Sequence, residues 1–94
     1  MTNNLDIFRK EFLEANSWAQ RKDGVPLDLL DNLTDEQLKI AEVELINVVS
    51  LKDNWPILGL GHIKSKDALP KLYDLLDKSR GSMKVTIANS IFKI

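Results

Sequence analysis

Apolar residues recur along most of this chain at spacings of three and four, which is the period of an amphipathic α-helix. The first such segment predicts a helix over about residues 4–21, with its apolar face at Leu5, Phe8, Phe12, Ala15 and Ala19. Asn3 or Asn4 can cap its start, and Gly24 followed by Pro26 ends it. One or two further helical turns are predicted over residues 27–33. No segment alternates apolar and polar residues cleanly over about six positions, so the pattern predicts no β-strand.

A second helix is predicted over residues 35–51, because Thr34 and Gln37 have the spacing of a capping box. One face of this helix carries Leu38, Ala41, Leu45, Val48 and Val49, and the opposite side carries Ile40, Val43 and Ile46. A helix that is apolar on two sides is normally buried on two sides. We therefore expect this helix to lie at the centre of the domain.

Three more helices are predicted in the C-terminal half, over about residues 55–63, 66–78 and 82–94. Asn54 is the expected N-cap of the first, and Pro56 is tolerated in its first turn, which needs no backbone donor. Pro70 lies a few residues inside the second helix and is expected to bend it. The apolar stripe of the last helix consists of Ile87, Ala88, Ile91 and Ile94. The connections are short, so successive helices should be antiparallel neighbours.

Small or apolar residues recur at the same phase when the chain is shifted by 31 residues. The shift sets 58–63 on 89–94, and it sets Leu69, Leu72 and Leu76 on Leu38, Ala41 and Leu45. Within the first of these segments, Gly59 and Gly61 remove side chains where two helices cross, so that the backbones can approach closely. A helical hairpin cannot bury its apolar face alone, and such hairpins therefore stack.

The segments 58–63, 68–72 and 75–77 resemble the short HEAT-like repeat of phycobilin-lyase-type and other bacterial helical-repeat proteins. The resemblance covers residues 55–79, is weaker over 81–94, and does not extend to 1–34. Residues 78–85 lack the Val-Arg pair that the family has before its second helix. The resemblance implies an all-α, armadillo-type fold, an α/α superhelix-like stack of antiparallel helical hairpins with about five helices. Residues 1–34 would be an N-terminal helix and capping loop, and residues 35–94 the HEAT-like hairpins of one domain.

Composition and charge narrow the class of protein. A chain of 94 residues is one domain by length, and no apolar run reaches the roughly 18 residues of a membrane span. The absence of cysteine excludes disulfides and thiolate metal sites. The first residues also lack the pattern of a secretory signal, and both observations together predict a cytoplasmic location. Residues 1–50 hold 5 Lys/Arg and 10 Asp/Glu, whereas residues 51–94 hold 8 and 4. The acidic and basic halves could pair head to tail, dock a charged partner, or simply be solvated.

Candidate catalytic groups are sparse. His62 is the one histidine, and we expect it at a helix C-terminus, where a cation favours the negative end of the helix dipole. One imidazole without thiolates cannot fill a zinc shell, and the acidic residues between 23 and 36 lack the order of a calcium loop. We therefore predict no catalytic residue, no cofactor and no metal.

The sequence accordingly predicts a non-catalytic protein–protein interaction module, with a regulatory or immunity-type protein as its specific version. A lyase-type enzyme subunit, which the resemblance implies, is one alternative, and a nucleic-acid-binding helical-repeat domain is another. Lys64 and Lys66 are expected at the opposite edge of the stack from Lys78 and Arg80, and this separation argues against one continuous groove for nucleic acid.

The candidates for contact with a protein partner are Trp18, Ile87, Ile91, Ile94, Lys78 and Arg80. Trp18 lies off the main apolar face of its helix, so it either packs under residues 23–33 or serves as an interface anchor. The stripe of the last helix has no polar cap after it, although repeat arrays need one. We expect a further repeat, a partner or a second copy to cover it, the last of these as a homodimer through the C-terminal helix.

Overall fold

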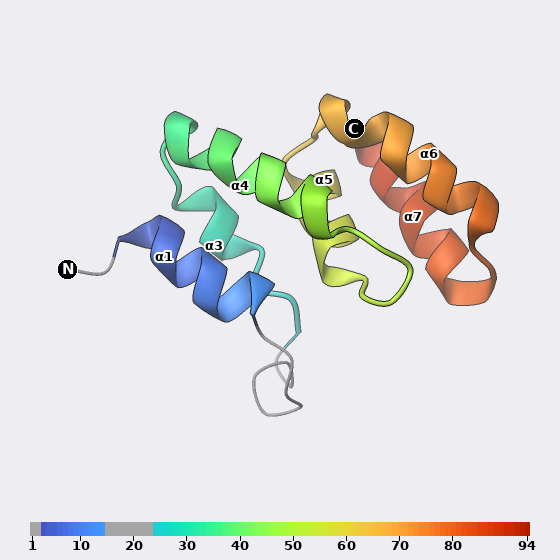
Figure 1. Ribbon diagram of the computed structural model, residues 1–94, viewed down its shortest axis with the longest axis horizontal. Coiled ribbons are helices and arrows are strands. Elements are labelled where there is room, and N and C mark those ends of the chain that lie inside the picture. Colours follow the sequence, from blue (N-terminus) through green and yellow to red (C-terminus); the bar gives the residue numbers. More distant parts are fainter. Residues whose placement is uncertain (1–2, 15–23) are drawn as a thin grey trace.

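The computed structural model describes residues 3–14 and 24–94, and these ranges contain six α-helices and no β-strand (Figure 1). The α-helices are α1 (Asn4–Phe8), α3 (Asp28–Asp31), α4 (Asp35–Val48), α5 (Trp55–His62), α6 (Leu69–Lys78) and α7 (Gly81–Lys93). A π-helical turn, η1 (Arg9–Leu13), continues α1, and a 3₁₀ turn, η2 (Lys66–Ala68), precedes α6. The predicted all-α class is confirmed for the described part of the chain.

The N-terminal helix begins where the sequence predicts it to begin. The side chain of Asn3 accepts a hydrogen bond from the backbone N–H of Asp6 at 2.9 Å, so Asn3 is the N-cap. The helical stretch of α1 and η1 buries Leu5, Phe8 and Phe12, as the periodicity predicts. The rest of the predicted helix, up to residue 21, lies outside the described residues.

Helix α4 starts at the predicted capping box. The Thr34 hydroxyl accepts from the Gln37 N–H at 3.2 Å, and the Gln37 side chain accepts from the Thr34 N–H at 3.0 Å. The prediction that this helix is buried on two sides is wrong, because Ile40 and Val43 are 44% and 56% exposed. Only one face of α4 is covered, through Ala41 and Leu45. Val48, which was predicted on that inner face, is exposed as well.

The central helix is α5, not α4. Six of its eight residues are buried, and α5 packs against α4 on one side and α7 on the other. A Cβ built on Gly59 would lie 3.0 Å from Cζ of Phe12, and one built on Gly61 would lie 2.9 Å from Cβ of Ser90. The prediction that both glycines permit close helix crossings is therefore confirmed.

The start of α5 differs from the prediction in one detail. Asn54 occupies the N-cap position, but its side chain makes no capping hydrogen bond. The carboxylate of Asp53 instead accepts from the backbone N–H of Trp55 at 3.0 Å. Pro56 lies in the first turn of α5, as predicted.

The C-terminal pair consists of α6 and α7, which pack against each other. Pro70 does not bend α6, because the residues before it form η2 and α6 itself starts at Leu69. Pro70 thus lies in the first turn of α6. A backbone N–H there would have no acceptor within the helix, so the missing N–H of proline breaks no helical hydrogen bond. Leu72 of α6 and Ile87 of α7 are fully buried.

The helices form one continuous hydrophobic core. Leu5, Phe8 and Phe12 belong to the same buried cluster as Leu72 and Ile87. Figure 1 shows α1 and α3 at one end, α6 and α7 at the other, and α4 and α5 between them. The final helix, α7, is therefore a terminal element of the bundle.

Candidate functional site

The predicted contact residues of the last helix belong mostly to the core of the molecule itself. Ile87 is 0% exposed, and Ile91 and Ile94 are half-buried against the same core. Ile87 is therefore a core residue and not a partner contact, which corrects the prediction. The physical reason is that α5 and α6 already cover the stripe that was expected to need a partner.

The other predicted contacts lie elsewhere. Lys78 is exposed at the end of α6, and its Nζ pairs with Asp74 Oδ2 of the same helix at 2.9 Å. Arg80 is exposed at the N-cap position of α7. Trp18 lies outside the described residues. Among the described residues, Lys78 and Arg80 lie beside the start of α7 and Ile94 follows its end, so these predicted contacts are at opposite ends of the helix.

A different side of α7 is exposed and apolar. Val85 is 60% exposed, Phe92 is 92% exposed, and Ala88 between them is exposed as well. Their spacing of three and four places them on one side of the helix, opposite Ile87. We call Val85, Ala88 and Phe92 the outer face of α7. The sequence has apolar residues on two sides of α7, but only the stripe of Ile87, Ile91 and Ile94 was singled out. The prediction that Ala88 belongs to that stripe is wrong, because Ala88 is exposed.

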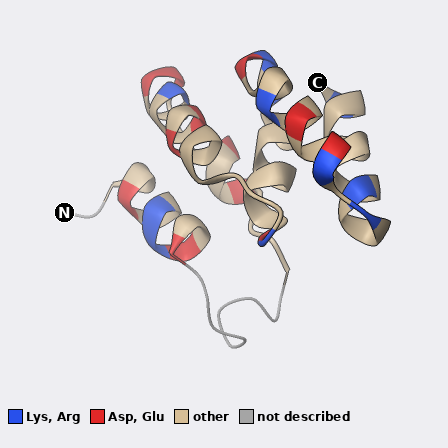
Figure 2. Cartoon of the chain, turned by 45° about the vertical axis from the view of Figure 1, so that its right-hand side comes forward, with Lys and Arg blue, Asp and Glu red and all other residues tan. Residues whose placement is uncertain are grey.

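The charged side chains of α7 itself are of one sign. Residues 78–94 contain four Lys or Arg and no Asp or Glu. Figure 2 shows this distribution, with basic but no acidic residues on α7. Lys84 directly precedes Val85 and Lys93 directly follows Phe92, and one residue rotates an α-helix by about 100°, so one lysine borders the outer face on each side.

A second apolar surface lies on α4. Ile40 and Val43, together with Arg9, Lys39 and Glu44, line a shallow depression of about 460 Å³. Its charges are of both signs, and its apolar part consists of two aliphatic side chains. It is therefore a less distinctive surface than the outer face of α7.

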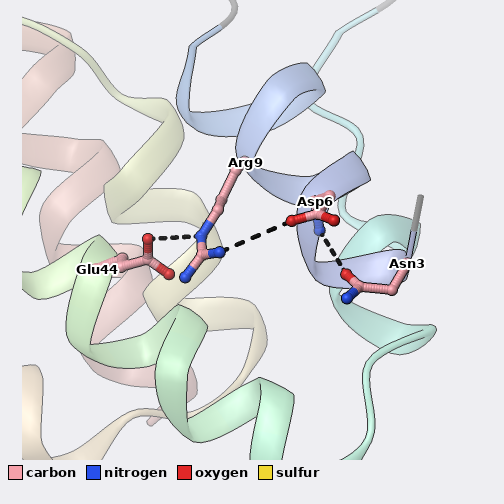
Figure 3. A network of polar contacts seen from close by, with 4 residues as sticks. All are labelled: Asn3, Asp6, Arg9 and Glu44. Atoms are coloured by element: carbon pink, nitrogen blue, oxygen red, sulfur yellow. Dashed lines mark hydrogen bonds and ion pairs between the residues drawn. The ribbon is translucent and has the colours of Figure 1, made fainter. Parts of the chain in front are cut away.

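The polar edge of this α4 surface is a small network centred on Arg9 (Figure 3). Arg9 Nε donates to Glu44 Oε1 at 2.8 Å, and Arg9 Nη1 lies 3.8 Å from Asp6 Oδ1. The hydrogen bond to Glu44 raises the pKa of the Arg9 guanidinium above its ordinary value, so Arg9 remains charged. The network connects the N-terminal helix to α4, and we interpret it as a contact that stabilises the fold.

His62 ends α5, as predicted, and its ring contacts an acidic residue that the sequence did not point to. His62 Nε2 lies 2.8 Å from Asp31 Oδ1, so the pair joins α5 to α3. The Asp31 side chain is 64% exposed. Catalytic His–Asp pairs are oriented against a nucleophile in a protected site, whereas this pair lies at the surface.

Neither a metal centre nor a membrane span is found in the described ranges. Within residues 3–14 and 24–94, no three His, Asp or Glu side chains converge as a metal-binding group. The helices of these same ranges are too short or too polar to cross a bilayer. Among the described residues, the outer face of α7 contains the most exposed large apolar side chain, that of Phe92.

Comparison with protein-family models, with curated proteins and with solved structures finds no match to this chain.

Proposed function

We propose that this chain is a non-catalytic protein-interaction module built from two HEAT-like hairpins, and that it binds a protein partner through the outer face of α7. The hairpins are α4–α5 and α6–α7. The packing of α5 against both α4 and α7, and of α6 against α7, supports this division. Stacked hairpins require such contacts between neighbouring units.

The shift of 31 residues supports the stacking more specifically. It places Gly59 on Ser90 and Gly61 on Phe92. Gly59 faces η1, α3 and α4, which precede α5, and Ser90 faces α5, which precedes α7. Gly61 faces α7, the second helix of the next hairpin, whereas its counterpart Phe92 is 92% exposed. The outer face of α7 thus corresponds to the face of α5 that α7 covers.

The proposal rests mainly on the exposure of the Phe92 side chain. Burying a phenylalanine side chain is worth about 1.5–3 kcal/mol relative to leaving it in water. Large aromatic side chains are also common anchors at protein interfaces. With Val85 and Ala88 beside it, Phe92 offers a partner a helical face with apolar residues at positions i, i+3 and i+7.

The positions of the acidic and basic side chains support binding over catalysis. In the described part of the chain, the one His–Asp pair lies at the surface, and the Asp31 side chain is 64% exposed. The alternative of a lyase-type enzyme subunit would need a convergent set of acid and base groups. The exposed aromatic needs only a complementary surface.

Substitution at Phe92 tests the proposal. Tagged wild-type, Phe92→Ala and Tyr73→Ala chains would be purified from cells that express the protein, and each retained protein would then be purified and titrated by calorimetry. Tyr73 is a matched control, because it is an exposed aromatic residue on the neighbouring helix α6. We expect a partner that binds the wild type and Tyr73→Ala but binds Phe92→Ala about tenfold or more weakly.

The proposal fails if every purified partner binds Phe92→Ala as tightly as it binds the wild type. Titration with duplex and single-stranded DNA at low salt tests the nucleic-acid alternative in the same experiment. Binding that falls steeply with salt and is indifferent to Phe92→Ala would favour that alternative.

A further inference from the structure

The chemistry of the outer face of α7 indicates what its partner must look like. Lys84 and Lys93 border this face, and both are exposed. In the described part of the molecule neither of them makes an ion pair, whereas Lys78 is already paired with Asp74. A partner that buries Val85 and Phe92 must therefore approach two free cations, one on each side.

Phe92 excludes one occupant, namely a further hairpin stacked as α7 is stacked on α5. At the corresponding position of α5, Gly61 allows Ser90 to approach so closely that even a single Cβ would lie 2.9 Å away. A phenylalanine cannot permit that separation. The occupant must instead cross at a larger distance and offer a recess for an aromatic ring.

Charge argues against a second copy of this chain in two-fold contact. An antiparallel pairing of α7 with itself, centred between Ala88 and Asn89, would place Lys84 of both copies on one border of the interface and Lys93 of both copies on the other. No acidic residue of α7 would pair with any of these four lysines. Because electrostatic complementarity favours specific contacts, a homodimer through α7 fits this face less well than a partner that carries carboxylates.

We infer that the occupant of the outer face of α7 is an amphipathic helix of another protein, whose apolar stripe is bordered by Asp or Glu. This inference rests on the proposed function. A helix fits because Val85 to Phe92 spans two turns, about 10 Å, which matches the ridge that two packed helices share. Carboxylates on both borders would meet Lys84 and Lys93, and small residues in the stripe would leave the recess for Phe92.

Two synthetic peptides test the inference. Both carry the same Leu/Ala stripe, one bordered by Glu and the other by Lys, and each is titrated into the isotope-labelled protein while the backbone amide signals are recorded by NMR. We expect the Glu-bordered peptide to shift signals of residues 84–93. In 0.5 M salt, in Phe92→Ala and in the double variant Lys84→Glu/Lys93→Glu, we expect its affinity to fall by about tenfold or more. Val43→Ala, on α4, is the matched control and should bind normally.

The outcomes separate the inference from the proposed function. Equal binding of the two peptides at α7 would overturn the acidic border and leave the docking face in place. If neither peptide moves the α7 signals, the helical partner is wrong, and only the Phe92→Ala comparison with purified partners then decides the proposed function. Two further results would overturn the inference. If phosphatidylserine vesicles shift the α7 signals and the peptides do not, the outer face binds a lipid surface. If the wild type is a dimer and Phe92→Ala is a monomer, the occupant is a second copy of this chain.

Discussion

Gly61 of α5 lies so close to Ser90 of α7 that a Cβ built on Gly61 would stand 2.9 Å from both Cβ and Oγ of Ser90. The same Cβ would be 3.0 Å from Cα of Ser90, which is a backbone atom. A rotamer change of Ser90 therefore cannot relieve the contact. The separation of the two helices depends on the absence of a side chain at residue 61.

Gly61→Ala should consequently destabilise the protein. Overpacking of a close contact costs about 1–3 kcal/mol, while the higher helix propensity of alanine contributes about 1 kcal/mol in the opposite direction. We expect a net loss of about 1 kcal/mol in the free energy of unfolding, measured by urea titration. Adding Ser90→Gly should recover part of that loss, because it removes two of the three close atoms. An unchanged or raised unfolding midpoint in Gly61→Ala would contradict the close packing of α5 on α7.

Truncation of a side chain should lower the free energy of unfolding strongly on the inner side of α7 and hardly at all on the outer face. Ile87→Ala removes a fully buried side chain from the core and should cost about 2–5 kcal/mol. Phe92→Ala removes an exposed one and should change the free energy of unfolding by less than about 0.5 kcal/mol. Thermal melts of both variants check this. A large loss in Phe92→Ala would mean that Phe92 packs within the domain, and that variant would then be unsuitable as a probe of binding.

The contact between the N-terminal helix and α5 depends on aromatic packing. The ring of Phe12 lies with its centroid 5.2 Å from that of Phe8 and 5.7 Å from that of Trp55. Phe12→Ala should cost about 3–5 kcal/mol, whereas Phe12→Leu leaves a smaller cavity and should cost less. Near-ultraviolet circular dichroism and chemical unfolding measure both effects. A Phe12→Ala variant as stable as the wild type would show that this contact contributes little to the core.

The capping box of α4 gives a prediction that involves no core residue. Thr34→Ala removes the acceptor for the Gln37 N–H and should lower stability by about 1 kcal/mol. Thr34→Ser keeps the hydroxyl and is the matched control. If alanine and serine gave the same unfolding midpoint, the hydroxyl would make no net contribution.

Local signals in the sequence were the most reliable guide to this fold. The Asn3 cap, the Thr34–Gln37 box and the glycine crossings at 59 and 61 all follow from residues within one turn of each other, and the structure contains all of them. The predicted bend at Pro70 was wrong because the helix was expected to start near residue 66, whereas residues Lys66–Ala68 form a 3₁₀ turn and α6 starts at Leu69. Helix boundaries are the least well defined part of such a prediction.

Which helix occupies the centre was harder to predict. Both α4 and α7 have apolar residues on two sides, yet only one side of each helix is buried. A bundle of few helices has room for one fully covered element, and α5 takes that place because seven of its eight residues are apolar or glycine. The exposed Phe92 follows from this competition among helices, which periodicity within a single helix does not report.

The composition of α5 also leads to an expectation about how this protein assembles. The helix has eight residues, including Pro56, Gly59 and Gly61, and isolated helices shorter than about 12–15 residues are marginal in water even with good helix formers. We therefore expect α5 to acquire its structure only as its neighbours close around it. The element at the middle of the molecule would then be among the last to form, and a polypeptide cut between α5 and α6 should leave neither fragment able to fold alone.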